Sequence, residues 1–300
     1  MHGKVFLLLL PFLIWFAGAV VVSCLFVYLV KSRRWTGRSL FIRHLLPGPG
    51  GVLRQQLSRV SDKLDYYLFL FAFLFPLLVV LLVARRILCP APLYPLSLPS
   101  VTFYLIVFGG LAFLLGRVLR LLAEQRNLSF SLECELAVGQ ELNLLMRQGC
   151  SVFHDVPDDG DKIDHVLVGP SGIYAVATKW RANPGKKRLE VEDRVFYDGK
   201  VLVFPDGEET GPVVQVRRQA VWLADWLSGV VGEKVSVKAI VFLPGWVVES
   251  SGRSEVSVVN EKSAPLLGKP RGGDVLAEDL RQRIACQVEQ RCRIMAGGHG

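Results

Sequence analysis

The sequence predicts an α/β domain with a mixed sheet, in the order α-β-β-β-α-β, preceded by three transmembrane α-helices. Two observations predict this division. The first part of the chain contains long runs without a charged residue, and the part after about residue 127 changes from helical to strand periodicity and back. We therefore expect a membrane region at 1–127 and a separate folded domain at 128–300.

Three uncharged runs account for the membrane prediction. Residues 5–30 form a run of 26, and residues 66–84 and 98–116 form runs of 19 each. A helix needs about 20 apolar residues to cross a bilayer core. A cleaved signal peptide is an alternative for the first run, because Val21 to Cys24 is similar to a lipoprotein cleavage site. Its apolar stretch continues past that site, so a membrane span is favoured.

The charge distribution predicts the orientation. Residues 1–116 carry 11 Lys and Arg against 2 acidic residues, whereas residues 117–300 carry 24 against 25, so the high net charge is no argument for nucleic-acid binding. Residues 31–65 alone hold eight basic side chains, which is typical of a cytoplasmic loop. We expect an external N-terminus and a cytoplasmic domain at 128–300, with the protein in the inner membrane of a bacterial-type cell.

Periodicity and turn signals give the elements of the second part. An amphipathic helix is expected at 132–148, ended by Gly149, and glycine-rich turns separate the β-rich runs that follow. A turn at Asp198-Gly199 indicates a hairpin. The predicted strands are 151–156, 163–169, 172–179, 189–197, 200–204 and 234–242, and the later helices are 214–227 and 275–289. The chain has no Walker or GxGxxG sequence, and its six cysteines form no CxxC pair.

Chemistry concentrates where two of these strands meet. Asp164 lies on one strand and Lys179 ends the next, across a tight Gly-Pro-Ser-Gly turn that makes the two strands neighbours. The stretches VGQELNLLMRQGCSVFHDVP, IDHVLVGPSGIYAVATKWR and QVRRQAVWLADWL resemble the nuclease-related domain (NERD) family. That resemblance implies a restriction-endonuclease-like core of the PD-(D/E)xK superfamily over most of residues 133–289.

The resemblance also implies roles for single residues. Asp164 falls on the metal-binding aspartate of the family, Lys179 on the lysine of its ExK element, and Glu141 on or next to the acidic residue of the first helix. Gln215 falls on the glutamine that opens the second helix. One position departs from the pattern, because Ala177 stands where the family has a carboxylate. Residues two apart on a strand share a face, so this carboxylate would help to hold a metal beside the lysine.

Two functional classes follow from this departure. An active enzyme would be a membrane-tethered phosphodiester hydrolase using Mg²⁺ or Mn²⁺ held by Asp164 and Glu141, because Mg²⁺ is bound by one or two carboxylates plus substrate phosphates. A degraded nuclease would bind nucleic acid or a protein partner without efficient cleavage. The missing ligand at Ala177 favours the second class. A transporter is disfavoured, because the three predicted spans contain no ionisable Asp, Glu, Lys, Arg or His.

Partners and further side chains complete the expectations. DNA is favoured over RNA as the nucleic acid, and the lipid bilayer is the second partner. Glu133 and Glu135 are expected to be exposed helix charges, and His154 and His165 to lie at the sheet surface rather than bind metal. A local basic cluster could contact phosphates, although such runs are usually solvated. Its members are Arg181, Lys186, Lys187 and Arg188.

Overall fold

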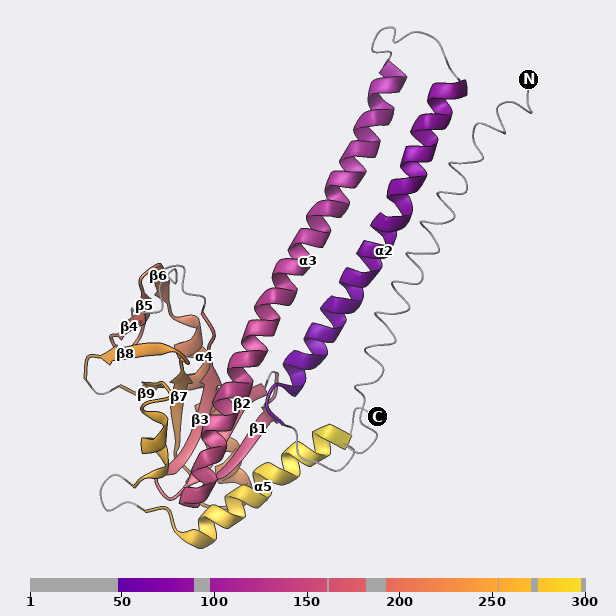
Figure 1. Cartoon of the computed structure of the whole chain (residues 1–300). Coiled ribbons are helices and arrows are strands. Elements are labelled where there is room, and N and C mark those ends of the chain that lie inside the picture. Colours follow the sequence, from indigo (N-terminus) through magenta and orange to yellow (C-terminus); the bar gives the residue numbers. More distant parts are fainter. Residues whose placement is uncertain are drawn as a thin grey trace. The chain divides into compact units, whose positions relative to one another are not determined.

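Long helices and two β-sheets make up the part of the chain that the computed structural model describes, which is residues 48–88, 98–160, 162–181, 193–252, 254–270 and 275–297 (Figure 1). The chain divides into two compact units. One comprises Met1–Ile42 and Gln56–Asn127, and the other comprises Arg43–Gln55 and Leu128–Gly300. Each unit is described below by itself.

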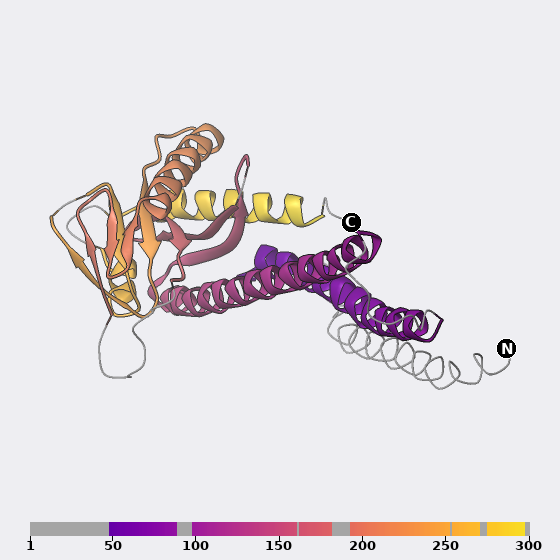
Figure 2. The same ribbon diagram turned by 90° about the horizontal axis from the view of Figure 1, so that it is seen from above.

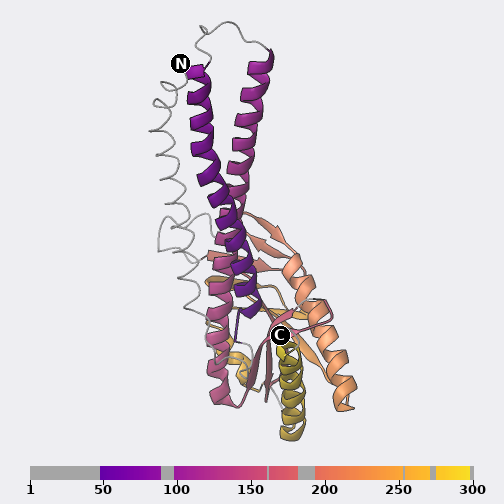
Figure 3. The same ribbon diagram turned by 90° about the vertical axis from the view of Figure 1, so that its right-hand side faces the viewer.

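In the first unit, helices α2 (Gly51–Leu88) and α3 (Leu98–Leu144) run side by side over the parts that belong to this unit (Figures 1 and 3). Gln125 donates a hydrogen bond to the Ser61 hydroxyl across the pair at 2.9 Å. The Arg117 guanidinium lies over the Tyr67 ring, 5.6 Å from its centroid. Polar side chains therefore help to join the two helices.

The predicted spans at 66–84 and 98–116 fall within α2 and α3, and the predicted span at 5–30 lies outside the described residues. Across the described ranges, no helix is both long and apolar enough to cross a bilayer. The helices themselves are confirmed there, whereas their role as membrane spans is not shown.

The second unit contains a five-stranded mixed sheet in the order β1-β2-β3-β7-β9. Strands β1, β2 and β3 pair antiparallel, and β3, β7 and β9 pair parallel. The predicted mixed sheet is therefore confirmed. The bounds are β1 Ser151–Pro157, β2 Lys162–Gly169, β3 Gly172–Thr178, β7 Val237–Phe242 and β9 Val256–Val259.

Helices cover both faces of this sheet (Figure 2). Helices α4 (Gly211–Val231) and α5 (Glu278–Gly297) pack on one face, where Val216, Leu223 and Ile284 are fully buried. The C-terminal turns of α3 and the short 3₁₀ helices η2 (Leu145–Gln148) and η3 (Ala264–Gly268) cover the other face. The sheet reads as nearly continuous apolar strands because both its faces are buried.

A second, smaller sheet has the order β6-β5-β4-β8. Its strands are β4 Asp193–Tyr197, β5 Leu202–Phe204, β6 Gly207–Glu209 and β8 Trp246–Ser250. The hairpin predicted around Asp198-Gly199 is confirmed as β4 and β5. Strands β6, β8 and β9 were not predicted, because runs of three to five residues carry too little alternation to be recognised.

The boundaries of the predicted helices shift by a few residues. The helix expected at 132–148 is the end of α3, which continues without a break from the predicted third span. Gly149 ends this segment with φ of 77°, as expected for a helix C-terminus. The helix expected at 214–227 begins three residues earlier, where Thr210 precedes Gly211 and Pro212.

Candidate functional site

Asp164 lies near the start of β2, beside the end of β3. Its Oδ2 accepts a hydrogen bond from the backbone N–H of Thr178 at 2.8 Å. This contact arises because β2 and β3 form a hairpin in which Gly169 faces Gly172. Burial raises the pKa of Asp164 above its ordinary value. The tight turn predicted that Asp164 lies next to the end of the following strand, and this prediction is confirmed.

Ala177 is buried, with 4% of its surface exposed, and its methyl group belongs to the apolar core under α4. It brings no oxygen or nitrogen side-chain atom to the site. A hard divalent cation needs oxygen ligands, so this position contributes nothing to a metal shell. The residue that the sequence singles out as the missing ligand is thus part of the packing between β3 and α4.

The acidic side chain that α3 brings to the strands is Glu135. It is 2% exposed, so the expectation that Glu135 is a solvated helix charge is wrong. Glu141 follows six positions later, which places the two about 120° apart around a helix of 3.6 residues per turn. Glu135 shares its face with Val138 and Leu142, both buried, whereas Glu141 remains partly exposed.

Lys162 joins Glu135 to the strands. Its ammonium lies 2.7 Å from Glu135 Oε1 and 3.5 Å from Asp164 Oδ1, and it also contacts Asp155 Oδ1. The ammonium side chain is 13% exposed, and Glu135 and Asp155 are below 5%. These four residues, Glu135, Asp155, Lys162 and Asp164, are called the acid–lysine cluster below.

Burial and neighbouring charges shift pKa values within the acid–lysine cluster. Burial raises the pKa of Glu135 to about 7, and the neighbouring Asp164 carboxylate acts in the same direction. Burial alone would lower the pKa of Lys162, but the three carboxylates together raise it above its ordinary value. The charged form of Lys162 is therefore favoured, and Glu135 takes up a proton near neutrality.

Asp155 reaches this cluster through an unusual backbone. It is the only non-glycine residue with a positive φ, 50°, among those that the structure describes. Aspartate tolerates this left-handed region better than most residues do. In β1, Val156 pairs with Ile163 and His154 with His165, so the irregularity falls directly opposite Asp164. Neither Asp155 nor Lys162 was predicted as a site residue.

Lys179 follows β3, where its backbone N–H donates to Phe242 O at 3.0 Å. Its ammonium pairs with Glu209 Oε1 at 2.7 Å, and it is partly exposed. Arg181 pairs with the other oxygen of Glu209 at 2.9 Å and with Asp206 at 2.9 Å. Lys179, predicted as the ExK lysine, and Arg181, predicted as a phosphate contact, thus already have carboxylate partners from the β5–β6 hairpin and its turn. Lys186, Lys187 and Arg188 lie outside the described residues.

The glutamine that meets the site strands is Gln219 rather than Gln215. Gln215 lies in the first turns of α4 and is partly exposed. Gln219, one turn later, is 1% exposed and donates from Nε2 to the backbone oxygen of Lys162 at 2.7 Å. Its Oε1 is buried without a hydrogen-bond partner. Gln219 therefore fixes the backbone that presents Lys162.

His154 and His165 are buried, which corrects the expectation that they lie at the sheet surface. Their Nδ1 atoms are 2.8 Å apart, His154 Nε2 lies 3.2 Å from Asn143 Oδ1, and His165 Nε2 lies 3.2 Å from Thr178 Oγ1. Burial lowers the pKa of both rings. One pattern satisfies every ring nitrogen with both rings neutral: His154 donates to Asn143, His165 donates to His154, and Thr178 donates to His165.

The donor set does not fit a resident divalent cation. Within the described ranges no group of three or more histidine, cysteine, aspartate or glutamate side chains is arranged to hold one. The three carboxylates that converge near Asp164 are bound to the Lys162 ammonium instead. Ala177 supplies no further ligand.

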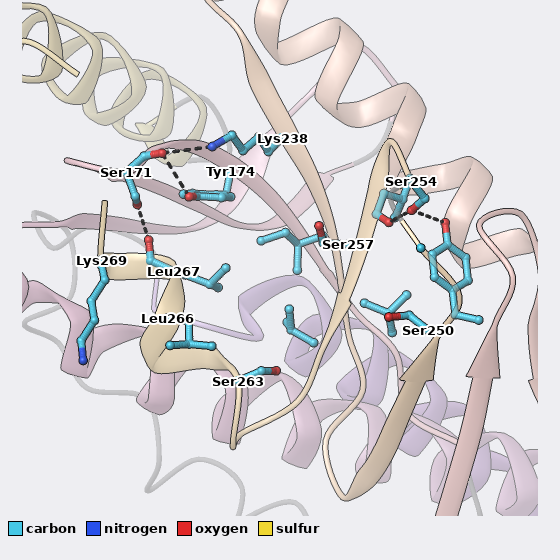
Figure 4. A pocket seen from close by; sticks show the side chains of 16 residues that line it. Ser171, Tyr174, Lys238, Ser250, Ser254, Ser257, Ser263, Leu266, Leu267 and Lys269 are labelled. Atoms are coloured by element: carbon cyan, nitrogen blue, oxygen red, sulfur yellow. Dashed lines mark hydrogen bonds between the residues drawn. The ribbon is translucent and has the colours of Figure 1, made fainter. Parts of the chain in front are cut away.

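A separate cavity of about 440 Å³ lies near β7, β9 and η3 (Figure 4). Polar side chains of its lining form hydrogen bonds within the protein. Lys238 donates to Ser171 O at 3.1 Å, and the Ser171 hydroxyl donates to Leu267 O. The hydroxyl of Tyr174 also donates to Ser171 O. The lining includes no member of the acid–lysine cluster, so this cavity is distinct from the site predicted around Asp164.

Residues 131–244 match the family model described as the nuclease-related domain. The resemblance to NERD is therefore confirmed for this range, and membership of the PD-(D/E)xK superfamily is a general property of NERD domains. The range contains the acid–lysine cluster, Ala177 and Lys179. No curated protein and no solved structure matches the chain significantly.

The raised pKa of Glu135 predicts a pH-dependent stability. A carboxyl group whose pKa rises from 4.5 to about 7 on folding stabilises the folded state at low pH, and this stability is lost as the pH rises between those values. Glu135→Gln cannot ionise, so relative to wild type it gains up to about 3 kcal/mol across this window. Urea denaturation followed by tryptophan fluorescence at several pH values measures the difference.

Glu141→Gln is the matched control on the same helix. Its free energy of unfolding should run parallel to that of wild type over the whole window. If Glu135→Gln also ran parallel, ionisation of Glu135 would carry no folding penalty, and the description of its burial would be wrong.

Proposed function

We propose that the domain at 128–300 is a nucleic-acid-binding NERD domain with impaired metal-dependent phosphodiester cleavage. The observation that carries this proposal is the side-chain set around Asp164: Ala177 offers no ligand, and the Lys162 ammonium pairs with the carboxylates that remain. Loss of a carboxylate would weaken the hold on a divalent cation, which would supply a polarised water for this chemistry. The alternative is an active Mg²⁺-dependent nuclease using Asp164, Glu141, Lys179 and Gln215.

Cleavage distinguishes the two. In a plasmid-nicking assay with millimolar Mg²⁺ or Mn²⁺, we expect the wild-type protein to cut no faster than Asp164→Ala. Contaminating nucleases would act equally in both preparations. Nicking by the wild-type protein that disappears in Asp164→Ala would establish the active enzyme in its place.

Binding in this proposal depends on Lys179 and Arg181. Both cations follow β3, whose last residue, Thr178, donates to Asp164, and both are partly exposed, so a phosphate backbone could reach them. Glu209 now holds both of them, at 2.7 and 2.9 Å. A bound phosphate would replace Glu209, because guanidinium and ammonium groups pair with either anion.

Glu209→Gln should therefore tighten nucleic-acid binding, since it removes the competing carboxylate and leaves the cations in place. Lys179→Ala should weaken binding and reduce the slope of log K against log salt by about 1. Fluorescence anisotropy with a labelled DNA duplex, and with an RNA of the same sequence, measures both effects and the preference between the two.

Glu208→Gln is the control, because Glu208 is an exposed carboxylate next to Glu209 in β6 and changes the net charge equally. A gain in affinity that is the same for Glu208→Gln and Glu209→Gln would reflect net charge alone. Binding without salt dependence would exclude a phosphate contact and favour a protein partner.

We further propose that residues 1–127 attach the protein to the inner membrane, with the NERD domain in the cytoplasm. Support comes from the three uncharged runs and the basic loop at 31–65. The first unit also exposes large apolar side chains, which require cover by lipid or by a partner. They include Tyr66, Leu105, Ile106, Phe108, Phe113 and Leu115.

A reporter fused after Arg126 tests this topology. Alkaline phosphatase at this point should be inactive and a fluorescent protein fluorescent, because the first folds only outside the cytoplasm and the second only inside. The opposite pattern would place the domain outside. Recovery of the fusion in the supernatant after ultracentrifugation would show that residues 1–127 do not anchor it.

A further inference from the structure

Lys162 occupies the centre of a ring of acceptors. Its ammonium meets carboxylate oxygens from α3, β1 and β2, contributed by Glu135, Asp155 and Asp164. An ammonium has three N–H donors and no acceptor. Glu135 and Asp155 accept hydrogen bonds from it, and Asp164 lies at ion-pair distance, 3.5 Å. Gln219 fixes the backbone behind it through the 2.7 Å bond to Lys162 O. Contacts to both the side chain and the main chain of Lys162 therefore fix the position of its ammonium.

The start of α2 closes the same cluster from another direction. The backbone N–H of Gly50 donates to Glu135 Oε1 at 2.9 Å, and that of Gly51 donates to Asp155 Oδ2 at 2.6 Å. The first N–H groups of a helix have no partner within the helix and carry its positive end. Two carboxylates of the cluster thus satisfy these groups while they also pair with Lys162.

Glycine is required for this approach. Gly50 has φ of 77°, and a Cβ there would lie 2.3 Å from Leu132 Cδ1. A Cβ on Gly51 would lie 3.0 Å from Asp155 Oδ2, and one on Gly139 would lie 2.8 Å from the Pro49 ring. The segment Pro49 to Gly51 therefore fits closely over α3 and Asp155. This fit explains why Glu135 and Asp155 are shielded from solvent.

We propose that the Lys162 ammonium is a built-in cation that takes the place of a divalent metal among these carboxylates, with the start of α2 as the cover. Two consequences follow. The wild-type protein binds no divalent cation that depends on Asp164. Removing the ammonium leaves three carboxylates around a space that Mn²⁺ can enter, because two or three carboxylates and water suit this ion.

This inference extends the proposed function, since it states what fills the cluster, but its test measures metal binding alone. The cleavage and nucleic-acid-binding assays can each succeed or fail without deciding whether Lys162 replaces a metal. Conversely, a failure here would leave the salt-dependent binding through Lys179 unaffected, because Lys179 pairs with Glu209 and not with the cluster.

The experiment compares full-length wild type with Lys162→Ala. Free Mn²⁺ is measured by electron paramagnetic resonance during a titration, and melting temperature is recorded with and without Mn²⁺. We expect no saturable, Asp164-dependent site in wild type, and one new site per chain in Lys162→Ala that also raises its melting temperature. The double variant Lys162→Ala with Asp164→Asn should lose the new site.

Two controls separate cation replacement from general loosening. Lys238→Ala removes a lysine outside the cluster, one that donates to Ser171 O and lies over the Tyr174 ring, and should gain no site. Lys162→Arg keeps the charge and should also gain none. If Lys162→Ala is unfolded without metal, recovery of its folding by Mn²⁺ but not by Na⁺ supports the proposal.

Three results would overturn it. The first is Mn²⁺ binding by wild type that Asp164→Asn abolishes, since the metal site would then already exist beside Lys162. The second is a folded Lys162→Ala that binds no Mn²⁺. The third is an unfolded Lys162→Ala that Mn²⁺ does not restore, because the carboxylates would then be unable to accept a metal in place of the ammonium.

Discussion

The structure around the candidate site depends on one buried ammonium shared by three carboxylates. An uncompensated charge in a protein interior is costly, so removing one partner from a buried ion pair usually destabilises the fold severely. Lys162 links α3, β1 and β2 through side chains, and Glu135 and Asp155 add the start of α2 through backbone N–H groups. Elements far apart in the sequence are therefore joined through one buried ammonium and its carboxylate partners.

In the proposed metal-free site, Ala177 and Lys162 act in the same direction. Ala177 offers no oxygen ligand from β3, and Lys162 pairs with the carboxylates around it. In this proposal each feature by itself would weaken metal binding, and the pairing with Lys162 lets the carboxylates remain buried without a metal. Asp164 can thus be retained for the packing of β2 against β3, where it accepts from Thr178, whatever the domain does chemically.

The sequence predicts the part of this site that local geometry determines. Asp164 and the end of β3 meet because a tight turn joins their strands, and the absence of a carboxylate at Ala177 is visible directly. The choice between Glu135 and Glu141 could also have been made from helical spacing. Glu135, Val138 and Leu142 follow the buried stripe at i, i+3 and i+7, whereas Glu141 lies off it.

The same spacing rule would have favoured Gln219. It continues the buried stripe of Val216, Ala220, Leu223 and Leu227, and Gln215 does not. Lys162 and Asp155 are different. Lys162 resembles any polar residue that opens a strand, and Asp155 acquires its role from a left-handed backbone inside β1 that no local pattern signals. Contacts of this kind depend on the register of β1 against β2 and on the packing of the start of α2 against the cluster. Both are determined only when the whole unit folds.

Electrostatics also limits how this domain can meet nucleic acid. Residues 117–300 carry 24 basic and 25 acidic residues, so the domain provides no overall attraction for a polyanion. Lys179 and Arg181 already share Glu209, and a phosphate gains only the difference between its own interaction and that of the displaced carboxylate. Affinity through these two cations alone must therefore be modest. Strong binding would require contacts from the basic residues at 186–188 or a high local concentration of nucleic acid. If the protein is attached to a membrane, only nucleic acid near that membrane would reach such a concentration.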